Sequence, residues 1–87
     1  MEAFATRSHP SGDPNVGAVV RTHRAAKGLS QRSLARDAEM HYSTVQKIET
    51  GDRGLGLDSL ARLYGVLGID FAEDVLHEIL EGLDGTN

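Results

Sequence analysis

The chain has 87 residues, enough for one compact domain and too few for two. Hydrophobic residues make up 39% and charged residues 25% of the sequence, a composition typical of a globular protein and not of a disordered one. The sequence has no cysteine, which excludes disulfides and thiol chemistry, and it shows neither a signal-peptide pattern nor an apolar run of membrane-spanning length. We therefore expect a cytoplasmic protein.

The net charge of −4 is unevenly distributed along the chain. Residues 21–53 hold seven basic and four acidic side chains, whereas residues 54–87 hold seven acidic side chains and one basic side chain. A basic middle segment followed by an acidic segment can present one face to phosphate groups and turn the other away.

The first part of the chain predicts an arm followed by a helix. Residues 1–12 contain proline and glycine without periodicity and are expected to form a mobile arm. Asp13 as N-cap and Pro14 as first residue predict a helix start, and Gly28 predicts its end in the left-handed conformation. The residues expected on the buried stripe of this helix are Val16, Val19, Val20 and His23.

Four further helices are expected from apolar residues at three- and four-residue spacing. The first covers about residues 31–38, after an N-cap at Ser30, and the second covers about residues 42–49. The third covers about residues 57–67, with Leu60, Leu63, Tyr64 and Leu67 facing inward. The last opens with a capping box at Asp70–Glu73 and ends near Leu83. No alternating strand pattern is present. The predicted fold class is all-α, a bundle of five short helices.

The segment QRSLARDAEMHYSTVQKIET, from Gln31 to Thr50, fits two helices that cross at a steep angle through a short turn. Ala35 supplies the small residue needed where the two helices come closest. Apolar residues fill the inward positions Leu34, Ala38, Met40, Val45 and Ile48. The pattern predicts a helix-turn-helix unit within the bundle.

Together with GLSQRSLA, IETGDR and LARLYGVLGID, this segment resembles the XRE family of phage repressor and Cro proteins over about residues 16–76. The resemblance implies a lambda repressor-like bundle that binds operator DNA, with its third helix in the major groove. Two positions differ from the family pattern. Glu39 replaces the usual glycine of the turn, so it must accept a positive φ or the turn must change, and Asp52 makes the loop after the third helix less positive.

The resemblance also implies a set of DNA contacts. Gln31 matches a position that hydrogen-bonds a phosphate, Lys47 would donate to guanine O6 and N7, and Gln46 would pair with adenine. Arg53 and the backbone amides of its loop would hold the flanking phosphate. The full expected set is Gln31, Arg32, Tyr42, Ser43, Thr44, Gln46, Lys47 and Arg53.

Arg24 and Glu49 match a pair that joins the first helix to the end of the third in some family members. We expect them to form a structural salt bridge that also directs Arg24 toward the DNA backbone.

The last helix carries an apolar stripe that could cover the core of its own domain or contact a second copy of the chain. Its width favours a two-fold homodimer, which would place two recognition helices about 34 Å apart on a palindromic site. The expected dimerisation residues are Phe71, Val75, Leu76, Ile79, Leu80 and Leu83. The domain plan is then a DNA-binding domain over 13–69 and a dimerisation helix with a short tail over 70–87.

No grouping of serine, histidine and carboxylate side chains suggests an enzyme. Glu73, His77 and Glu81 lie at four-residue steps, but they fit a solvated acidic face better than a metal site, and we expect neither metal nor cofactor.

The predicted function is a transcriptional repressor or autoregulator, and the layout resembles the small controller proteins of restriction-modification systems. An antitoxin that binds a toxin and represses its own operon is the alternative, and a domain that has kept the fold but lost DNA binding is a third hypothesis. The expected partners are double-stranded operator DNA and a second copy of the chain, with a toxin or RNA polymerase as a further protein partner and no membrane.

Overall fold

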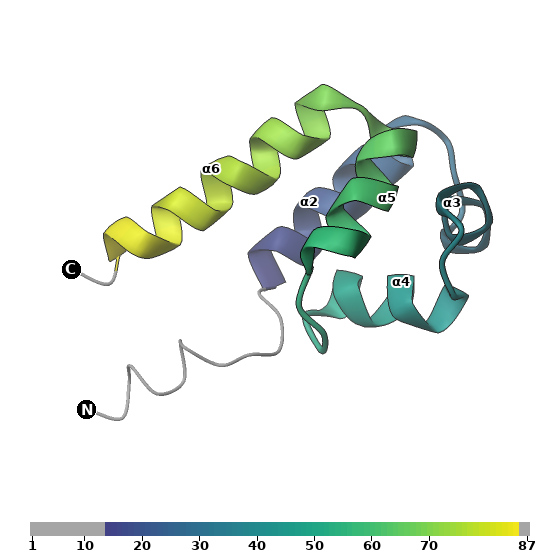
Figure 1. The fold of residues 1–87 in the computed structure, drawn as a ribbon, viewed down its shortest axis with the longest axis horizontal. Helices are drawn as coiled ribbons and strands as arrows, with labels where there is room; N and C mark the ends of the chain where they lie inside the picture. Colours follow the sequence, from purple (N-terminus) through teal and green to yellow (C-terminus); the bar gives the residue numbers. More distant parts are fainter. Residues whose placement is uncertain (1–13, 86–87) are drawn as a thin grey trace.

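The computed structural model describes residues 14–85, with side chains as far as residue 82. This part of the chain forms five helices and no strand, so the all-α prediction is confirmed (Figure 1). The expected arm and the expected N-cap at Asp13 lie outside the described residues. The helices are α2 (Pro14–Ala26), α3 (Gln31–Ala38), α4 (Tyr42–Thr50), α5 (Leu57–Leu67) and α6 (Ile69–Gly85).

The turns on both sides of α3 follow from local sequence signals. Gly28 has a φ of 71°, and the Leu29 amide donates to the Arg24 carbonyl oxygen at 3.1 Å, which closes the end of α2 in the predicted way. The Ser30 hydroxyl then accepts from the Ser33 amide at 3.0 Å and caps α3. These two contacts fix the direction in which α3 leaves α2.

Glu39 adopts the left-handed conformation at the turn between α3 and α4, with φ 58° and ψ 48°. Of the two possibilities that the sequence left open, the structure therefore contains the positive φ. This conformation is unfavourable for a residue with a Cβ, because the Cβ approaches the carbonyl oxygen that follows it.

The core is built by all five helices. Its largest fully buried side chains are Phe71, Leu34, Ile48, Leu63, Val20, Val45 and Val75. Two of the expected dimerisation residues, Phe71 and Val75, thus belong to the core of their own domain, and their assignment to an interface is wrong. The reason is that α6 packs along α2 and α5, where the Phe71 ring meets the His23 ring edge-on at a centroid distance of 5.9 Å.

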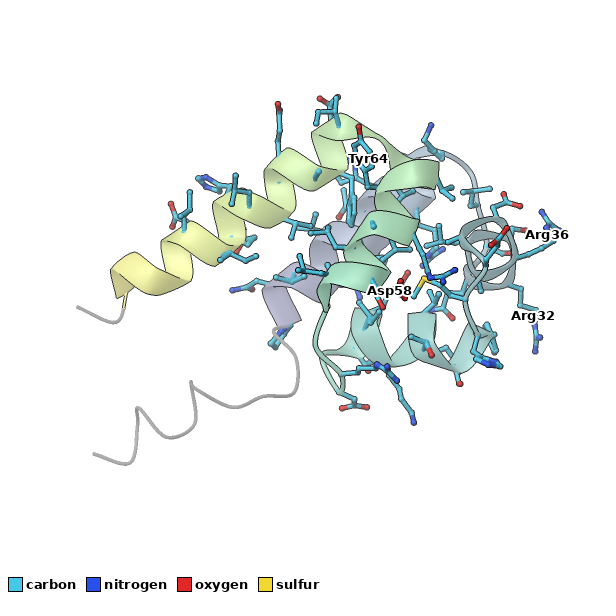
Figure 2. All side chains as sticks on the ribbon, viewed as in Figure 1. Arg32, Arg36, Asp58 and Tyr64 are labelled. Carbon is cyan, nitrogen blue, oxygen red and sulfur yellow. The ribbon has the colours of Figure 1, made fainter. Side chains whose placement is uncertain are left out.

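Tyr64 was also expected to face inward, but its side chain is half exposed. It lies near the corner where α5 meets α6 (Figure 2), and the inward positions of α5 are taken by Leu63 and Leu67.

Helix α6 begins at Ile69, one residue before the expected cap, so Asp70 lies in the first helical turn and no capping box forms there. Gly68, with φ 96°, separates α5 from α6. The C-terminal part of α6 extends beyond the other helices (Figure 1), which contributes to the long axis of 41 Å against 24 and 20 Å for the other two.

Gly17 marks the closest contact between α2 and α4. A Cβ at this position would lie against the Ile48 carbonyl oxygen and 2.6 Å from that of Glu49. Only glycine allows the backbones to approach so closely, and the position of α4 depends on this contact.

Candidate nucleic-acid interface

Helices α3 and α4 form the helix-turn-helix unit, and most of the expected contact residues lie on its outer surface. Arg32, Ser43, Gln46, Lys47 and Arg53 are exposed. The other three, Gln31, Tyr42 and Thr44, are half-buried. Arg32 projects outward from α3 beside Arg36 (Figure 2), so α3 adds a basic edge next to the outer face of α4.

A buried carboxylate holds α4 in place beneath this surface. Glu49 is only 3% exposed, and it accepts from Arg24 Nε at 2.6 Å, Arg24 Nη2 at 3.1 Å and Gln31 Nε2 at 2.9 Å. The three donors come from α2 and from the start of α3. The ion pair expected from the sequence is thus present, and it connects three helices through one side chain.

Arg24 makes a further contact beside Glu49. Its third guanidinium nitrogen, Nη1, donates to the Leu29 carbonyl oxygen at 3.0 Å, so every nitrogen of the group has a partner within the protein. The hydrogen bond to Glu49 raises the pKa of Arg24, with burial acting in the opposite direction. The guanidinium closes the end of α2 and neutralises Glu49. Only three of its five N–H donors are used in these contacts, so its expected direction toward the DNA backbone stays a prediction.

Gln31 keeps one amide hydrogen for a further acceptor, because a carboxamide has two N–H donors and Glu49 receives one of them. Its side chain can therefore join the buried network to an acceptor at the surface.

Tyr42 lies between two other residues of the expected contact set. The Arg32 guanidinium carbon is 4.1 Å from the centre of the Tyr42 ring, and Gln46 Nε2 donates to the Tyr42 hydroxyl at 2.9 Å. The first contact joins α3 to α4, and the second joins successive turns of α4. These three side chains, Arg32, Tyr42 and Gln46, are called the Tyr42 cluster below.

The loop after α4 folds back onto the helix. The amides of Asp52 and Arg53 both donate to the Lys47 carbonyl oxygen, at 2.9 and 3.2 Å. These two amides are therefore engaged in ending the helix. The expected phosphate contact of the loop stays a prediction for the amides that follow Arg53. The exposed Arg53 side chain remains suited to that contact.

Arg62 is a structural residue that the sequence reasoning missed. It donates from Nη1 to the Glu39 carbonyl oxygen at 3.1 Å and from Nε to Asp58 Oδ2 at 2.9 Å, and the Asp58 hydrogen bond raises the pKa of Arg62. It thereby holds the strained turn from the side of α5. The spacing of Asp58 and Arg62 signals their pairing, but nothing local signals the contact with Glu39.

One side of the exposed surface of α6 is apolar. Leu76, Ile79 and Leu80 are 55%, 47% and 51% exposed, and Ile69, which was not in the expected set, is 57% exposed. The side chain of Leu83 lies outside the described part of the chain. Ile69 lies three residues before Ala72 and seven before Leu76, so the apolar spacing of this helix face could have identified it as well.

Two other site types find no structural support in residues 14–82. No three metal-ligating side chains come together there, and His77 lies 3.4 Å from Glu81 as a surface pair. Among the described helices, none combines the length and apolarity that a membrane span requires.

Known proteins share this arrangement. The model of a family described as "Helix-turn-helix domain" matches residues 15–77. The structure of the restriction-modification controller protein C.AhdI from Aeromonas hydrophila is similar, with a TM-score of 0.64 and 35% sequence identity over 69% of this chain and 91% of that chain. The search of curated proteins gave no significant match.

Proposed function

Since the chain belongs to the XRE-type helix-turn-helix family of DNA-binding transcription regulators, we propose that it binds a palindromic operator as a homodimer and represses or autoregulates transcription. Its similarity to a restriction-modification controller protein over most of that protein's length supports a controller-like role.

The observation that carries the proposal is the fixed outer surface of α4. Gln46 and Lys47 are exposed on a helix whose inner side is held by buried Val45, Ile48 and Glu49. A recognition helix must present polar side chains to base edges from a rigid support, because base contacts require accurate placement. Here the support is the Glu49 network on one side and the close contact at Gly17 on the other.

The homodimer is supported by the exposed face of α6. Leu76, Ile79 and Leu80 are exposed on α6, whose C-terminal part extends beyond the other helices (Figure 1). A two-fold contact brings the same patch of both copies together. Such an assembly presents two α4 helices to successive turns of DNA. A dimer also doubles the number of phosphate contacts made by one complex.

The test is selection of bound sequences from random double-stranded DNA, followed by affinity measurements across a salt series. We expect an enriched inverted repeat whose affinity falls as salt rises. Lys47→Ala should relax the preference at one base position in each half-site, at a cost of about 1–3 kcal/mol there.

Arg53→Ala is the matched comparison, because it removes a cation that would contact a phosphate. It should weaken binding to all sequences about equally and reduce the salt slope by about one per site. If no sequence is enriched and binding is weak at low salt, the proposal is contradicted. The next candidate would then be a protein partner such as a toxin.

A further inference from the structure

The Tyr42 cluster joins a basic side chain on α3 to a carboxamide on α4 through one tyrosine. Tyr42 is the first residue of α4, and Gln46 stands one turn further along the same helix. Both Gln46 and Lys47 are exposed, but no hydrogen bond holds the Lys47 side chain among the described residues. Gln46 is thus the one of these two whose orientation the protein itself sets.

The hydrogen bond to Tyr42 decides which edge of the Gln46 amide is presented. One N–H of Nε2 is used by the tyrosine hydroxyl, whereas the second N–H and the oxygen Oε1 have no partner in the part of the chain that the structure describes. The remaining edge offers one acceptor and one donor. Adenine offers the complementary pair in the major groove, an N6 amino donor and an N7 acceptor, whereas guanine offers two acceptors there.

Building on the proposed function, we infer that Tyr42 is a positioning residue, which holds the Gln46 amide so that it reads adenine at one position of each half-site. The terminal torsion of a glutamine side chain is broad and about two-fold, so an unsupported amide presents either edge. The hydrogen bond from Nε2 to the tyrosine hydroxyl holds the amide in one of these orientations before DNA is bound. The conformational entropy of the Gln46 side chain is then lost on folding, so ordering this side chain does not weaken DNA binding.

Arg32 completes the arrangement on the other side of the tyrosine. Its guanidinium carbon lies over the Tyr42 ring, 4.1 Å from the ring centre. An arginine held in this way can donate to a phosphate from its edge. Arg32 would therefore couple a backbone contact to the orientation of the base-reading amide.

The experiment compares three single variants with the wild-type protein on the selected operator and on operators changed at each base pair. Gln46→Ala should reduce the discrimination for adenine at one position by about 5- to 150-fold. Tyr42→Phe keeps the ring beneath Arg32 and removes only the hydroxyl, and it should reduce discrimination at the same position by about 3- to 10-fold. The double variant should discriminate no worse than Gln46→Ala alone.

Tyr64→Phe is the matched control, because it removes the hydroxyl of the other tyrosine, which lies near the corner of α5 and α6 (Figure 2). It should leave base preference unchanged. Both tyrosine variants should keep the wild-type unfolding midpoint and salt slope, which separates a positioning role from a structural one.

The outcomes distinguish the inference from the proposed function. If the wild-type protein enriches an operator but Tyr42→Phe keeps the full adenine preference, the inference fails and the proposed function stands. Selection of guanine at the Gln46 position would also overturn the inference, because the amide would then present its donors only. If the wild-type protein enriches no sequence, the proposed function itself fails.

Discussion

At the scale of single residues, the buried charge of Glu49 explains why three polar side chains meet beneath the recognition helix. An ionised carboxylate loses several kcal/mol of hydration when buried, and only short hydrogen bonds with a cationic partner compensate for this loss. Glu49 receives three donors, two of them from Arg24. Each partner is therefore required by the other, and the pair contributes more to the position of α4 than to net stability.

Arg24→Met should lower the free energy of unfolding by about 3 kcal/mol, because it leaves Glu49 buried with Gln31 as its remaining partner. Arg36→Met is the control, because Arg36 pairs with Asp37 at the surface, and it should change stability by less than about 0.5 kcal/mol. Urea unfolding of the two variants measures the difference, and equal losses would show that Glu49 is not costly to leave unpaired.

The contribution of the Arg24–Glu49 pair to the free energy of unfolding should not change as the pH is raised from neutral to moderately alkaline values. Because the pKa of Arg24 is raised in the folded protein, its contribution is complete below the unfolded pKa and is lost only in strongly alkaline solution.

At the scale of helices, the contact between α2 and α4 depends on a glycine. Gly17 lies in the interior of α2, where glycine is normally unfavourable by about 1 kcal/mol relative to alanine. The benefit is the close approach of α2 to the carbonyl groups of Ile48 and Glu49. Packing between helices has overridden local helix propensity at this position.

Gly17→Ala should therefore destabilise the protein by about 2–3 kcal/mol, since the added methyl group must push the two backbones apart. Gly65→Ala provides the opposite case, because Gly65 lies in α5 with nothing within 4 Å of the position of its Cβ. That change should stabilise the protein by about 0.5–1 kcal/mol. Thermal unfolding checks both signs, and a neutral Gly17→Ala would mean that α4 is free to shift.

Local sequence signals predicted most of the helices, because caps and glycines act within a few residues. The bounds of α3 and α5 match the prediction, and Ser30 and Gly28 do what their types suggest. The start of α6 was missed because Gly68 ends one helix immediately before the next, which leaves no room for a separate cap.

The faces of helices were harder to predict, because they depend on how distant segments cross. Phe71, Val75 and Tyr64 all fit an apolar stripe, yet the first two are in the core and the third is not. Which side of a stripe is covered depends on the path of α6 over α2 and α5, and spacing along one helix does not contain this information. The contact of Arg32 with Tyr42 crosses two helices and was likewise beyond the sequence.

At the scale of the whole molecule, the elongated shape separates two surfaces with different chemistry. Helices α3 and α4, with their polar outer surface, lie at one end, and the C-terminal part of α6 extends toward the other end (Figure 1). Exposed leucine and isoleucine side chains lie on α6. In the proposed dimer, α6 joins the copies and leaves both α4 helices accessible.

Leu80→Glu should separate the proposed dimer, because it places an unpaired carboxylate in an apolar contact, and it should raise the dimer dissociation constant on the order of 100-fold. His77→Glu adds the same charge to the polar side of α6 and should leave the dimer intact. Sedimentation velocity distinguishes the two variants. A wild-type protein that sediments as a monomer at high concentration would contradict the dimer.

Helix α2 packs against both α4 and α6, so it determines the angle between the helix that faces DNA and the helix that joins the copies. In the dimer this angle sets the distance between half-sites, whereas the outer residues of α4 set the bases that are read. The two properties rest on different residues. Related regulators could therefore diverge in base preference while keeping one spacing, or change spacing through α2 and α6 while reading the same half-site.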